Sequence, residues 1–170
     1  MKSIHLCPHR LFDPVVLTGI SAINEVKKRG KLPGQIAGGM AVQSYLPSEA
    51  RRPSVDLDFD LLWGGSFGEF KELMVPFVES FKDQGYQVQH KKKGKAYEFF
   101  LSKEDVPEES LLVQHSRRSK PYFERNKPFF ERRVSNQRIF SKDGLVYTVL
   151  SPEDLALGKI LRAGTLATRN

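Results

Sequence analysis

The chain has 170 residues, a formal net charge of +7 and one cysteine, Cys7. This length suits one domain with a substantial core, and a single cysteine excludes an internal disulfide framework. No apolar run reaches the roughly 18 residues of a membrane helix, and the N-terminus lacks the layout of a secretory signal, so we expect a cytoplasmic protein without a membrane partner.

The first predicted elements are a helix, a short strand and a second helix. Over residues 12–30, apolar side chains recur at helical spacing before a basic last turn. Residues 35–37 are predicted to form a strand that leads into Gly38 and Gly39, and residues 40–45 a helix. The two glycines therefore lie at a strand-to-helix junction, where backbone amides and the positive end of a helix suit a phosphate group.

An acidic strand is predicted next. Residues 54–62 alternate polar and apolar side chains, which places Asp56, Asp58 and Asp60 on one face. Repeated aspartate is unfavourable in a strand because neighbouring carboxylates repel one another. A bound divalent cation would remove this conflict, and a sheet face open to water is the alternative interpretation.

The rest of the chain alternates predicted helices and strands. An amphipathic helix is expected over residues 67–84, and Pro76 should kink or split it. Strands are expected over residues 86–91, 97–101, 111–114, 138–140 and 145–150. A final helix is predicted to begin at Ser151, because serine is a favoured N-cap residue and a proline follows it in the first turn. Together these elements predict an α+β fold, a mixed β-sheet flanked by helices, in a single domain over residues 1–170.

Basic residues gather in three segments, residues 90–95, 117–120 and 125–133. The first has the composition of a turn between strands, so a solvated hairpin tip explains it best. The third interleaves Phe129 and Phe130 with arginines. Such a segment can stack on and neutralise single-stranded nucleic acid, although phenylalanine pairs are as often part of a core. No secondary structure is predicted for residues 117–133.

Three segments of the chain, in this order, resemble the nucleotidyltransferase superfamily. They are Gly38-Gly39, the string Arg52-x-Ser54-x-Asp56-Leu57-Asp58, and the segment from Ser151-Pro152-Glu153-Asp154-Leu155 to Lys159. The resemblance extends from about Gly38 to the C-terminus. The branch that the chain most resembles is that of the AbiEii-like abortive-infection toxins of type IV toxin–antitoxin systems.

The resemblance implies a metal and a nucleotide. Gly38 and Gly39 would bind the phosphates of a nucleoside triphosphate (NTP), which would be the substrate. Asp56 and Asp58 would be catalytic residues that ligate Mg²⁺ or Mn²⁺. A metal that bridges phosphate oxygens neutralises charge on the transferred group, so this assignment agrees with the chemistry of the residues.

The resemblance also implies roles for three basic or polar residues. Lys159 would approach the triphosphate as a catalytic and nucleotide-binding residue; a solvated helix residue is the alternative interpretation. Arg52 and Ser54 lead into the acidic strand and would support the nucleotide site.

The chain departs from the family pattern in three respects. Met40 and Ala41 stand where the family has a serine or threonine soon after the glycines. A third carboxylate is expected near residues 112–114, where Gln114 cannot accept a proton as a base; Glu98 and Asp60 are the candidate substitutes. Family members continue into a helical domain, near whose expected start this chain ends, so a truncated or reduced member is an open interpretation.

The leading hypothesis is a metal-dependent toxin of the nucleotidyltransferase fold that transfers a nucleotide from an NTP to an acceptor. Candidate partners are tRNA or another RNA as the acceptor, and a cognate antitoxin. One alternative is a non-catalytic member of the fold that binds nucleotide or RNA, and another is a small-molecule enzyme of the aminoglycoside nucleotidyltransferase type. The basic segments favour RNA over a cationic small molecule.

Overall fold

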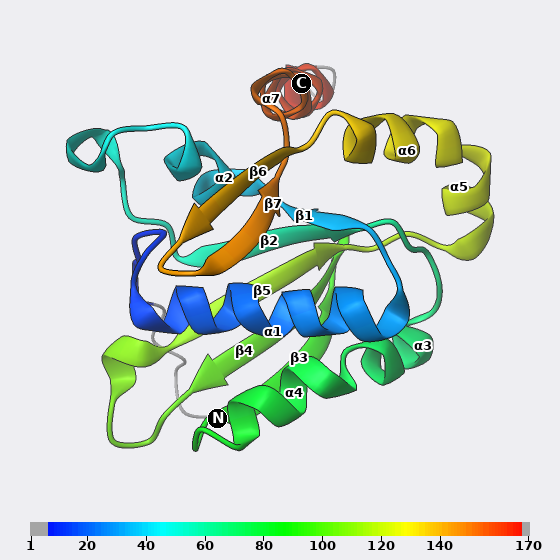
Figure 1. The fold of residues 1–170 in the computed structure, drawn as a ribbon. Coiled ribbons are helices and arrows are strands. Elements are labelled where there is room, and N and C mark those ends of the chain that lie inside the picture. Colours follow the sequence, from blue (N-terminus) through cyan, green and yellow to red (C-terminus); the bar gives the residue numbers. More distant parts are fainter. Residues whose placement is uncertain (1–6, 168–170) are drawn as a thin grey trace.

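In a computed structural model, the described part of the chain is residues 7–167, which form one seven-stranded mixed sheet with helices around it (Figure 1). The strand order is β3-β4-β5-β2-β1-β7-β6. The strands are β1 (Gly34–Ile36), β2 (Asp56–Leu61), β3 (Gln87–Lys93), β4 (Ala96–Ser102), β5 (Leu111–Ser116), β6 (Arg138–Lys142) and β7 (Leu145–Val149). The predicted α+β architecture, a mixed sheet flanked by helices, is confirmed.

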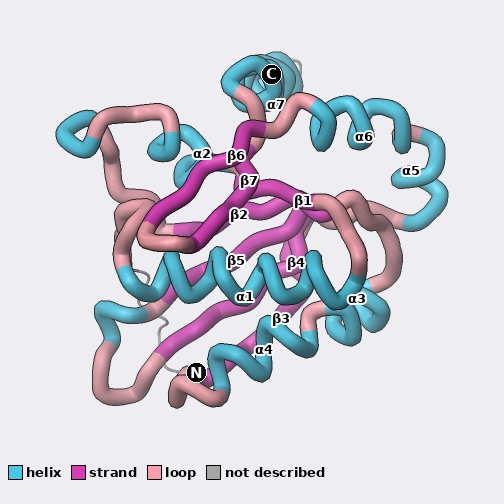
Figure 2. The backbone as a smooth tube through the Cα atoms, in the orientation of Figure 1, coloured by secondary structure: helices cyan, strands magenta, loops and turns pink. Residues whose placement is uncertain are grey.

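The helices pack around this sheet and connect its strands (Figure 2). They are α1 (Pro14–Gly30), α2 (Gly38–Ser44), α3 (Phe67–Leu73), α4 (Val75–Lys82), α5 (Lys120–Arg125), α6 (Lys127–Ser135) and α7 (Pro152–Ala167). None of those in the described part of the chain combines the length and the hydropathy that crossing a bilayer requires.

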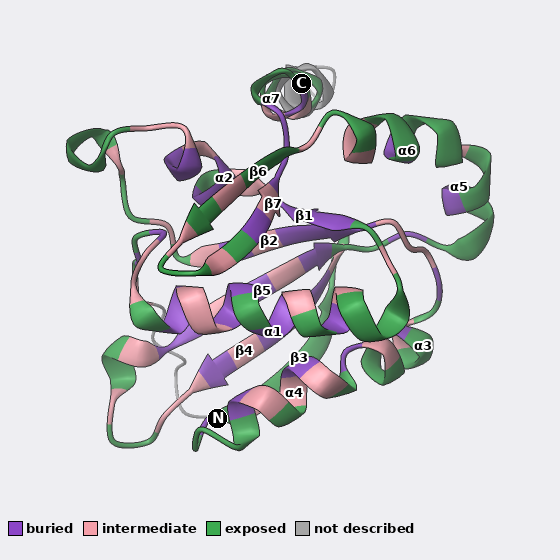
Figure 3. Ribbon diagram, viewed as in Figure 1, coloured by how far each residue is buried: buried purple, intermediate pink, exposed green. Residues whose placement is uncertain are grey.

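The hydrophobic core lies between one face of the sheet and the layer formed by α1, α3 and α4 (Figure 1). Buried residues line the strands β2, β5 and β4 and recur along α1 (Figure 3). Phe70, Phe77, Phe81 and Phe99 are the largest side chains that are completely buried. The core therefore fixes one face of β2, and the alternate residues of that strand project from the other face.

The predicted break at Pro76 is confirmed. The segment forms two helices, α3 and α4, with Met74 between them and the proline in the first turn of α4. A proline fits there because the first amides of a helix have no intrahelical acceptor. Ser66 and Glu69 start α3 with a reciprocal capping box: the Ser66 hydroxyl accepts from the Glu69 amide at 3.2 Å, and the Glu69 carboxylate accepts from the Ser66 amide at 2.7 Å.

The basic segment without a predicted structure, residues 117–133, contains α5 and most of α6. Each helix has a proline in its first turn, and the Ser119 hydroxyl accepts a hydrogen bond from the Tyr122 amide at 3.4 Å. Phe123 and Phe130 are buried and stack with ring centroids 5.5 Å apart. One phenylalanine of the pair at 129 and 130 is therefore buried, and Phe129 is 40% exposed.

Candidate active site

The turn from β1 into α2 packs directly against the acidic strand. The Ala37 amide donates to the Asp58 carbonyl oxygen at 2.9 Å. Gly38 follows with φ +61°, in the left-handed region that favours glycine. A Cβ atom at this position would overlap the Asp58 carboxylate and lie 2.7 Å from its Cγ. Glycine is thus required at position 38 both by the backbone and by the carboxylate beside it.

Helix α2 starts at this turn, and its intrahelical bonds begin with the Ala41 amide, which donates to the Ala37 carbonyl oxygen at 3.2 Å. The amides of the preceding residues consequently have no acceptor within the helix. Gly39 is exposed, and a Cβ atom there would lie 2.9 Å from the Ser54 hydroxyl oxygen. The glycine turn therefore contacts both the strand and the segment that leads into it.

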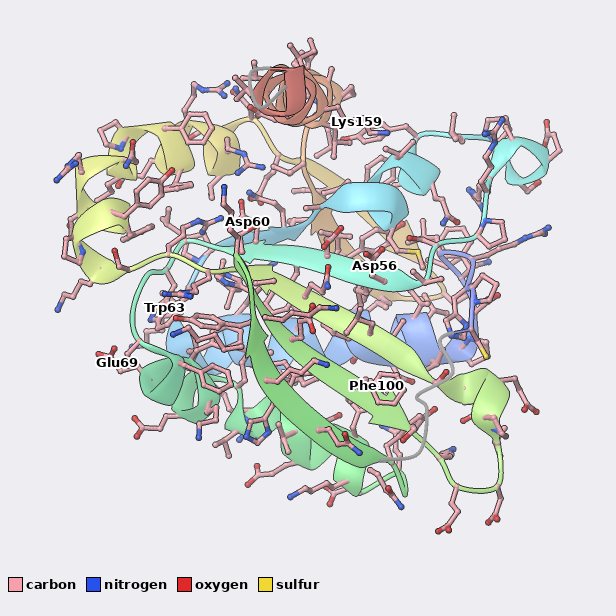
Figure 4. All side chains as sticks on the ribbon, turned by 180° about the vertical axis from the view of Figure 1, so that it is seen from behind. Asp56, Asp60, Trp63, Glu69, Phe100 and Lys159 are labelled. Carbon is pink, nitrogen blue, oxygen red and sulfur yellow. The ribbon has the colours of Figure 1, made fainter. Side chains whose placement is uncertain are left out.

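Asp56 and Asp58 are half-buried, and their alternation along β2 places them on the same face of that strand. Figure 4 shows Asp56 on β2. The Ser54 hydroxyl donates to Asp56 Oδ1 at 2.8 Å. Backbone hydrogen bonds with His9, 2.7 and 2.8 Å long, hold Ser54 in place. The structure brings together Gly38, Gly39, Ser54, Asp56 and Asp58, which we call the glycine–aspartate cluster.

The neighbouring strand places an amide where a third carboxylate was expected. In the parallel pair of β2 and β5, Asp58 lies opposite Gln114, and Gln114 lies opposite Glu98 of β4. The Gln114 side-chain amide donates to Glu98 Oε1 at 2.8 Å. Glu98 is buried and lies two strands from Asp58, about 10 Å away at the usual strand spacing.

The two aspartates offer oxygen donors that fit a magnesium ion. Among residues 7–167 there is no group of three or more His, Cys, Asp or Glu side chains arranged to hold a metal. Mg²⁺ often takes only one or two protein carboxylates and completes its octahedron with substrate phosphates and water. The glycine–aspartate cluster has this composition, with two carboxylates beside the backbone turn at Gly38.

Asp60, the third acid of the strand, is not available as a substitute for the third carboxylate, which corrects that expectation. It is buried and forms ion pairs with Arg118 and, at 2.8 Å, with Arg133. Burial raises the pKa of Asp60, but the two guanidinium groups outweigh it and hold the pKa below its usual value. The charge repulsion along β2 is therefore relieved at this position by two arginines rather than by a metal ion.

His115 packs in the core beside these groups and gives the fold a dependence on pH. Its Nε2 lies 3.3 Å from the Leu61 amide, from which it accepts, and the ring contacts Phe59, Phe70 and Trp63. Burial, with Arg118 nearby, lowers the pKa of His115 to about 3. Below about pH 6.5 the His115 imidazole therefore becomes protonated in the unfolded chain but stays neutral in the folded protein.

Stability should consequently fall as the pH drops from about 6.5 towards 3. For His115→Gln, which keeps an acceptor for the Leu61 amide but cannot titrate, we expect less of this loss. Between pH 7 and 5, the free energy of unfolding should fall by about 2 kcal/mol more in the parent than in His115→Gln. This follows from 1.36 kcal/mol for each pH unit below the unfolded pKa. Urea unfolding at the two pH values measures it, and parallel losses in both proteins would contradict the assignment to His115.

Two of the residues implicated by the sequence lie outside the cluster. Arg52 is exposed and makes no hydrogen bond or ion pair with any residue between 7 and 167. Its neighbour Arg51 binds the carbonyl oxygens of Gln43 and Leu46 at 3.0 and 3.1 Å, at the end of α2. This contact was not predicted from the sequence, and no local sequence pattern predicts it.

Lys159 is exposed on α7 and borders a groove of about 270 Å³ between that helix and α2 (Figure 4). Val42, Tyr45 and Leu46 line the α2 side of the groove. These residues lie at the C-terminal end of α2, whereas the glycines lie at its start. Lys159 thus approaches the same helix as the glycine–aspartate cluster but at the other end.

Comparison with known proteins gives one structural likeness. No protein-family model matches the chain, and no curated protein matches it. The chain is similar to the crystal structure of an antigenic nucleotidyltransferase-like protein from Paracoccidioides brasiliensis, with 16% sequence identity and a TM-score of 0.55. The match covers 86% of this chain and 65% of that one. At this identity the likeness concerns the fold and does not reach the AbiEii-like branch: the chain has a nucleotidyltransferase-like fold.

Proposed function

We propose that the protein binds a metal–NTP complex at the glycine–aspartate cluster and transfers a nucleotide from it to an acceptor. The observation that carries this proposal is the contact between Gly38 and the Asp58 carboxylate. It joins a turn suited to phosphate with the strand that carries the two acids. In a nucleotidyltransferase-like fold, this is the combination of groups that a metal-bound triphosphate requires.

Each residue of the cluster has a chemical task under this proposal. Asp56 and Asp58 would hold Mg²⁺ or Mn²⁺, and Ser54 keeps the Asp56 carboxylate oriented through its hydrogen bond. The bound metal would neutralise the negative charge of the phosphates. The glycine turn would admit the phosphates to the backbone amides. Lys159 would supply a positive charge for the departing pyrophosphate if the triphosphate extends along α2 from the glycines towards the other end of that helix.

The proposed acceptor is RNA, with tRNA as the first candidate. The excess of basic residues supports this choice, because a cationic small molecule such as an aminoglycoside would be repelled by it. We further propose action as a cytoplasmic toxin that a cognate antitoxin restrains, on the resemblance of the Arg52 to Asp58 string to the AbiEii-like family.

The test is transfer of label from each of the four α-labelled NTPs to total tRNA, with Mg²⁺ or Mn²⁺. The variant Asp56→Ala/Asp58→Ala serves as the blank, and metal-dependent NTP binding is measured in parallel. We expect labelled RNA with the parent chain and only background with the double variant. Equal labelling by both proteins would refute the assignment of the metal site.

A second candidate, a nucleotide-binding protein without turnover, is favoured by one observation. The position opposite Asp58 on β5 holds Gln114, which is bonded to Glu98 and cannot act as a base. Under this proposal the parent chain binds a metal–NTP complex without labelling any acceptor. Gln114→Asp should then gain transfer, because it places a third carboxylate beside Asp58. Transfer by the parent chain would exclude the second candidate.

A further inference from the structure

A second concave site lies beyond the C-terminal end of β5. A cleft of about 700 Å³ opens between α5, α6 and α7 and the ends of β4 and β5. We call it the basic–aromatic cleft, and the residues used in the argument are Lys95, Arg117, Arg118, Tyr122, Phe129 and Arg133. Neither the metal nor the triphosphate of the proposed reaction requires any of them.

The floor of the cleft is fixed by ion pairs and a ring contact. Arg118 is buried, donates to the Leu61 carbonyl oxygen at 3.0 Å and lies 4.2 Å from the centroid of the Phe130 ring. Arg118 and Arg133 share the single carboxylate of Asp60, so this group retains one net positive charge. The floor is therefore both rigid and cationic.

Further positive charge lines the rim of the cleft. Lys95 and Arg117 are exposed, and neither forms an ion pair with a residue in the described part of the chain. They come from the β3–β4 turn and from the residue after β5. Asp154, the one acid among the described residues that line the cleft, is paired with Arg132 at 2.5 Å. The cleft as a whole thus attracts a polyanion.

Two aromatic rings stand exposed on the wall formed by α5 and α6. Tyr122 is 53% exposed and Phe129 is 40% exposed. The Phe130 ring contacts both, with centroids 6.4 and 5.4 Å away. The guanidinium groups of Arg132 and Arg133 lie 5.7 and 5.5 Å from the Phe129 centroid. The wall therefore offers ring faces whose positions are set by neighbours, as base stacking requires.

We propose that the basic–aromatic cleft binds single-stranded nucleic acid, with its cations on the phosphates and Tyr122 and Phe129 against the bases. Unpaired bases present ring faces that a duplex hides, so the exposed rings favour a single strand. Asp60, the ion-pair partner of Arg118 and Arg133, lies on β2 two residues from Asp58. The two arginines of the cleft floor are thus linked to the strand that carries the glycine–aspartate cluster. Describing the nucleic acid bound in the cleft as the acceptor rests on the proposed function.

The experiment measures binding of a dye-labelled single-stranded RNA of about 12 nucleotides by fluorescence anisotropy, between about 50 and 200 mM salt. DNA of the same sequence and the matching RNA duplex are the other probes. We expect the single strands to bind more tightly than the duplex. Tighter binding of RNA than of DNA identifies contacts to the 2′-hydroxyl groups, and equal binding identifies recognition by backbone and stacking alone.

Variants separate the contributions of rings and charges. Tyr122→Ala and Phe129→Ala should each weaken binding about tenfold, and Arg117→Ala should reduce the slope of log K against log salt by about 0.7. All three side chains are exposed, so the fold should survive their removal. Lys28→Ala, an exposed cation of the last turn of α1, is the matched control and should bind as the parent does.

The proposal is overturned if the parent binds none of the probes, if the duplex binds as tightly as the single strands, or if the cleft variants bind like the Lys28→Ala control. Asp56→Ala/Asp58→Ala should lose transfer and keep nucleic-acid binding. Binding without transfer in the parent would therefore count against the proposed function alone. Transfer with unchanged binding in the cleft variants would count against the cleft alone.

Discussion

Asp60→Asn should lower the free energy of unfolding by about 3–5 kcal/mol, because it leaves two arginines facing each other without a counter-charge. Arg118 is buried and Arg133 is largely buried, so water cannot replace the lost carboxylate charge. Denaturant unfolding measures the change. Arg133→Met should cost less, since Arg118 then still faces Asp60.

A surface ion pair gives the matched control for this variant. Lys127 and Glu131 lie 4.0 Å apart on α6, with about half of each side chain exposed. Glu131→Gln should change the stability by less than about 0.5 kcal/mol. If Asp60→Asn changed it as little as Glu131→Gln does, the ion pairs of Asp60 would not hold α5 and α6 to the sheet.

The same carboxylate should make the protein sensitive to acid. The pKa of Asp60 is lower in the folded state than in the unfolded chain. Its contribution is therefore complete above the unfolded pKa, about 3.9, and is lost as the pH falls through the folded pKa. This loss begins at lower pH than the one from His115, so unfolding measured across pH separates the two groups.

Gly38→Ala is expected to damage both the fold and the proposed site. A left-handed backbone costs a residue with a Cβ about 1–2 kcal/mol, and the overlap of that Cβ with the Asp58 carboxylate adds about 1–3 kcal/mol. Relief of the overlap moves the carboxylate, and a displacement of about 1 Å can reduce a rate about 100-fold. We therefore expect a roughly 100-fold loss of nucleotide transfer together with reduced stability.

Gly39→Ala is the control for this change. Its Cβ would lie 2.9 Å from the Ser54 hydroxyl oxygen and 3.2 Å from Ser54 Cβ, so Ser54 must shift, but no carboxylate lies in its way. The residue is exposed and its backbone is not left-handed. The losses of stability and of metal-dependent NTP binding should be smaller than in Gly38→Ala, because Asp58 is not displaced. Equal losses in the two glycine variants would show that the contact of Gly38 with Asp58 is not what assembles the site.

Local sequence patterns were sufficient to predict most helices and strands of the fold. The helical spacing before Gly30 predicted α1, and the proline at 76 predicted the division into α3 and α4. The segment from 117 to 133 was missed because its charge obscured the apolar spacing. Ser119 and Asn126 each stand two residues before a proline, and this repeated helix-start pattern could have located α5 and α6.

The sequence named the residues of the candidate site, but not which of them are in contact. Gly38 and Asp58 are 20 positions apart, joined by one helix and one strand, and the structure brings them into contact. The partners of Asp60 lie 58 and 73 positions away, and strand alternation carries no information about them. The alternation gave the face of each aspartate correctly, but the identity of the cation that balances Asp60 is set by tertiary packing.

The strand order also bears on how the protein behaves in concentrated solution. The outer strands of the sheet are β3 and β6, whose unpaired backbone groups could in principle recruit another chain. Lys91, Lys92 and Lys93 line β3, and Arg138 and Lys142 stand at the two ends of β6. Like charges opposed across a strand pair are destabilising. Two copies that approach edge to edge therefore repel each other, which protects the open sheet from aggregation.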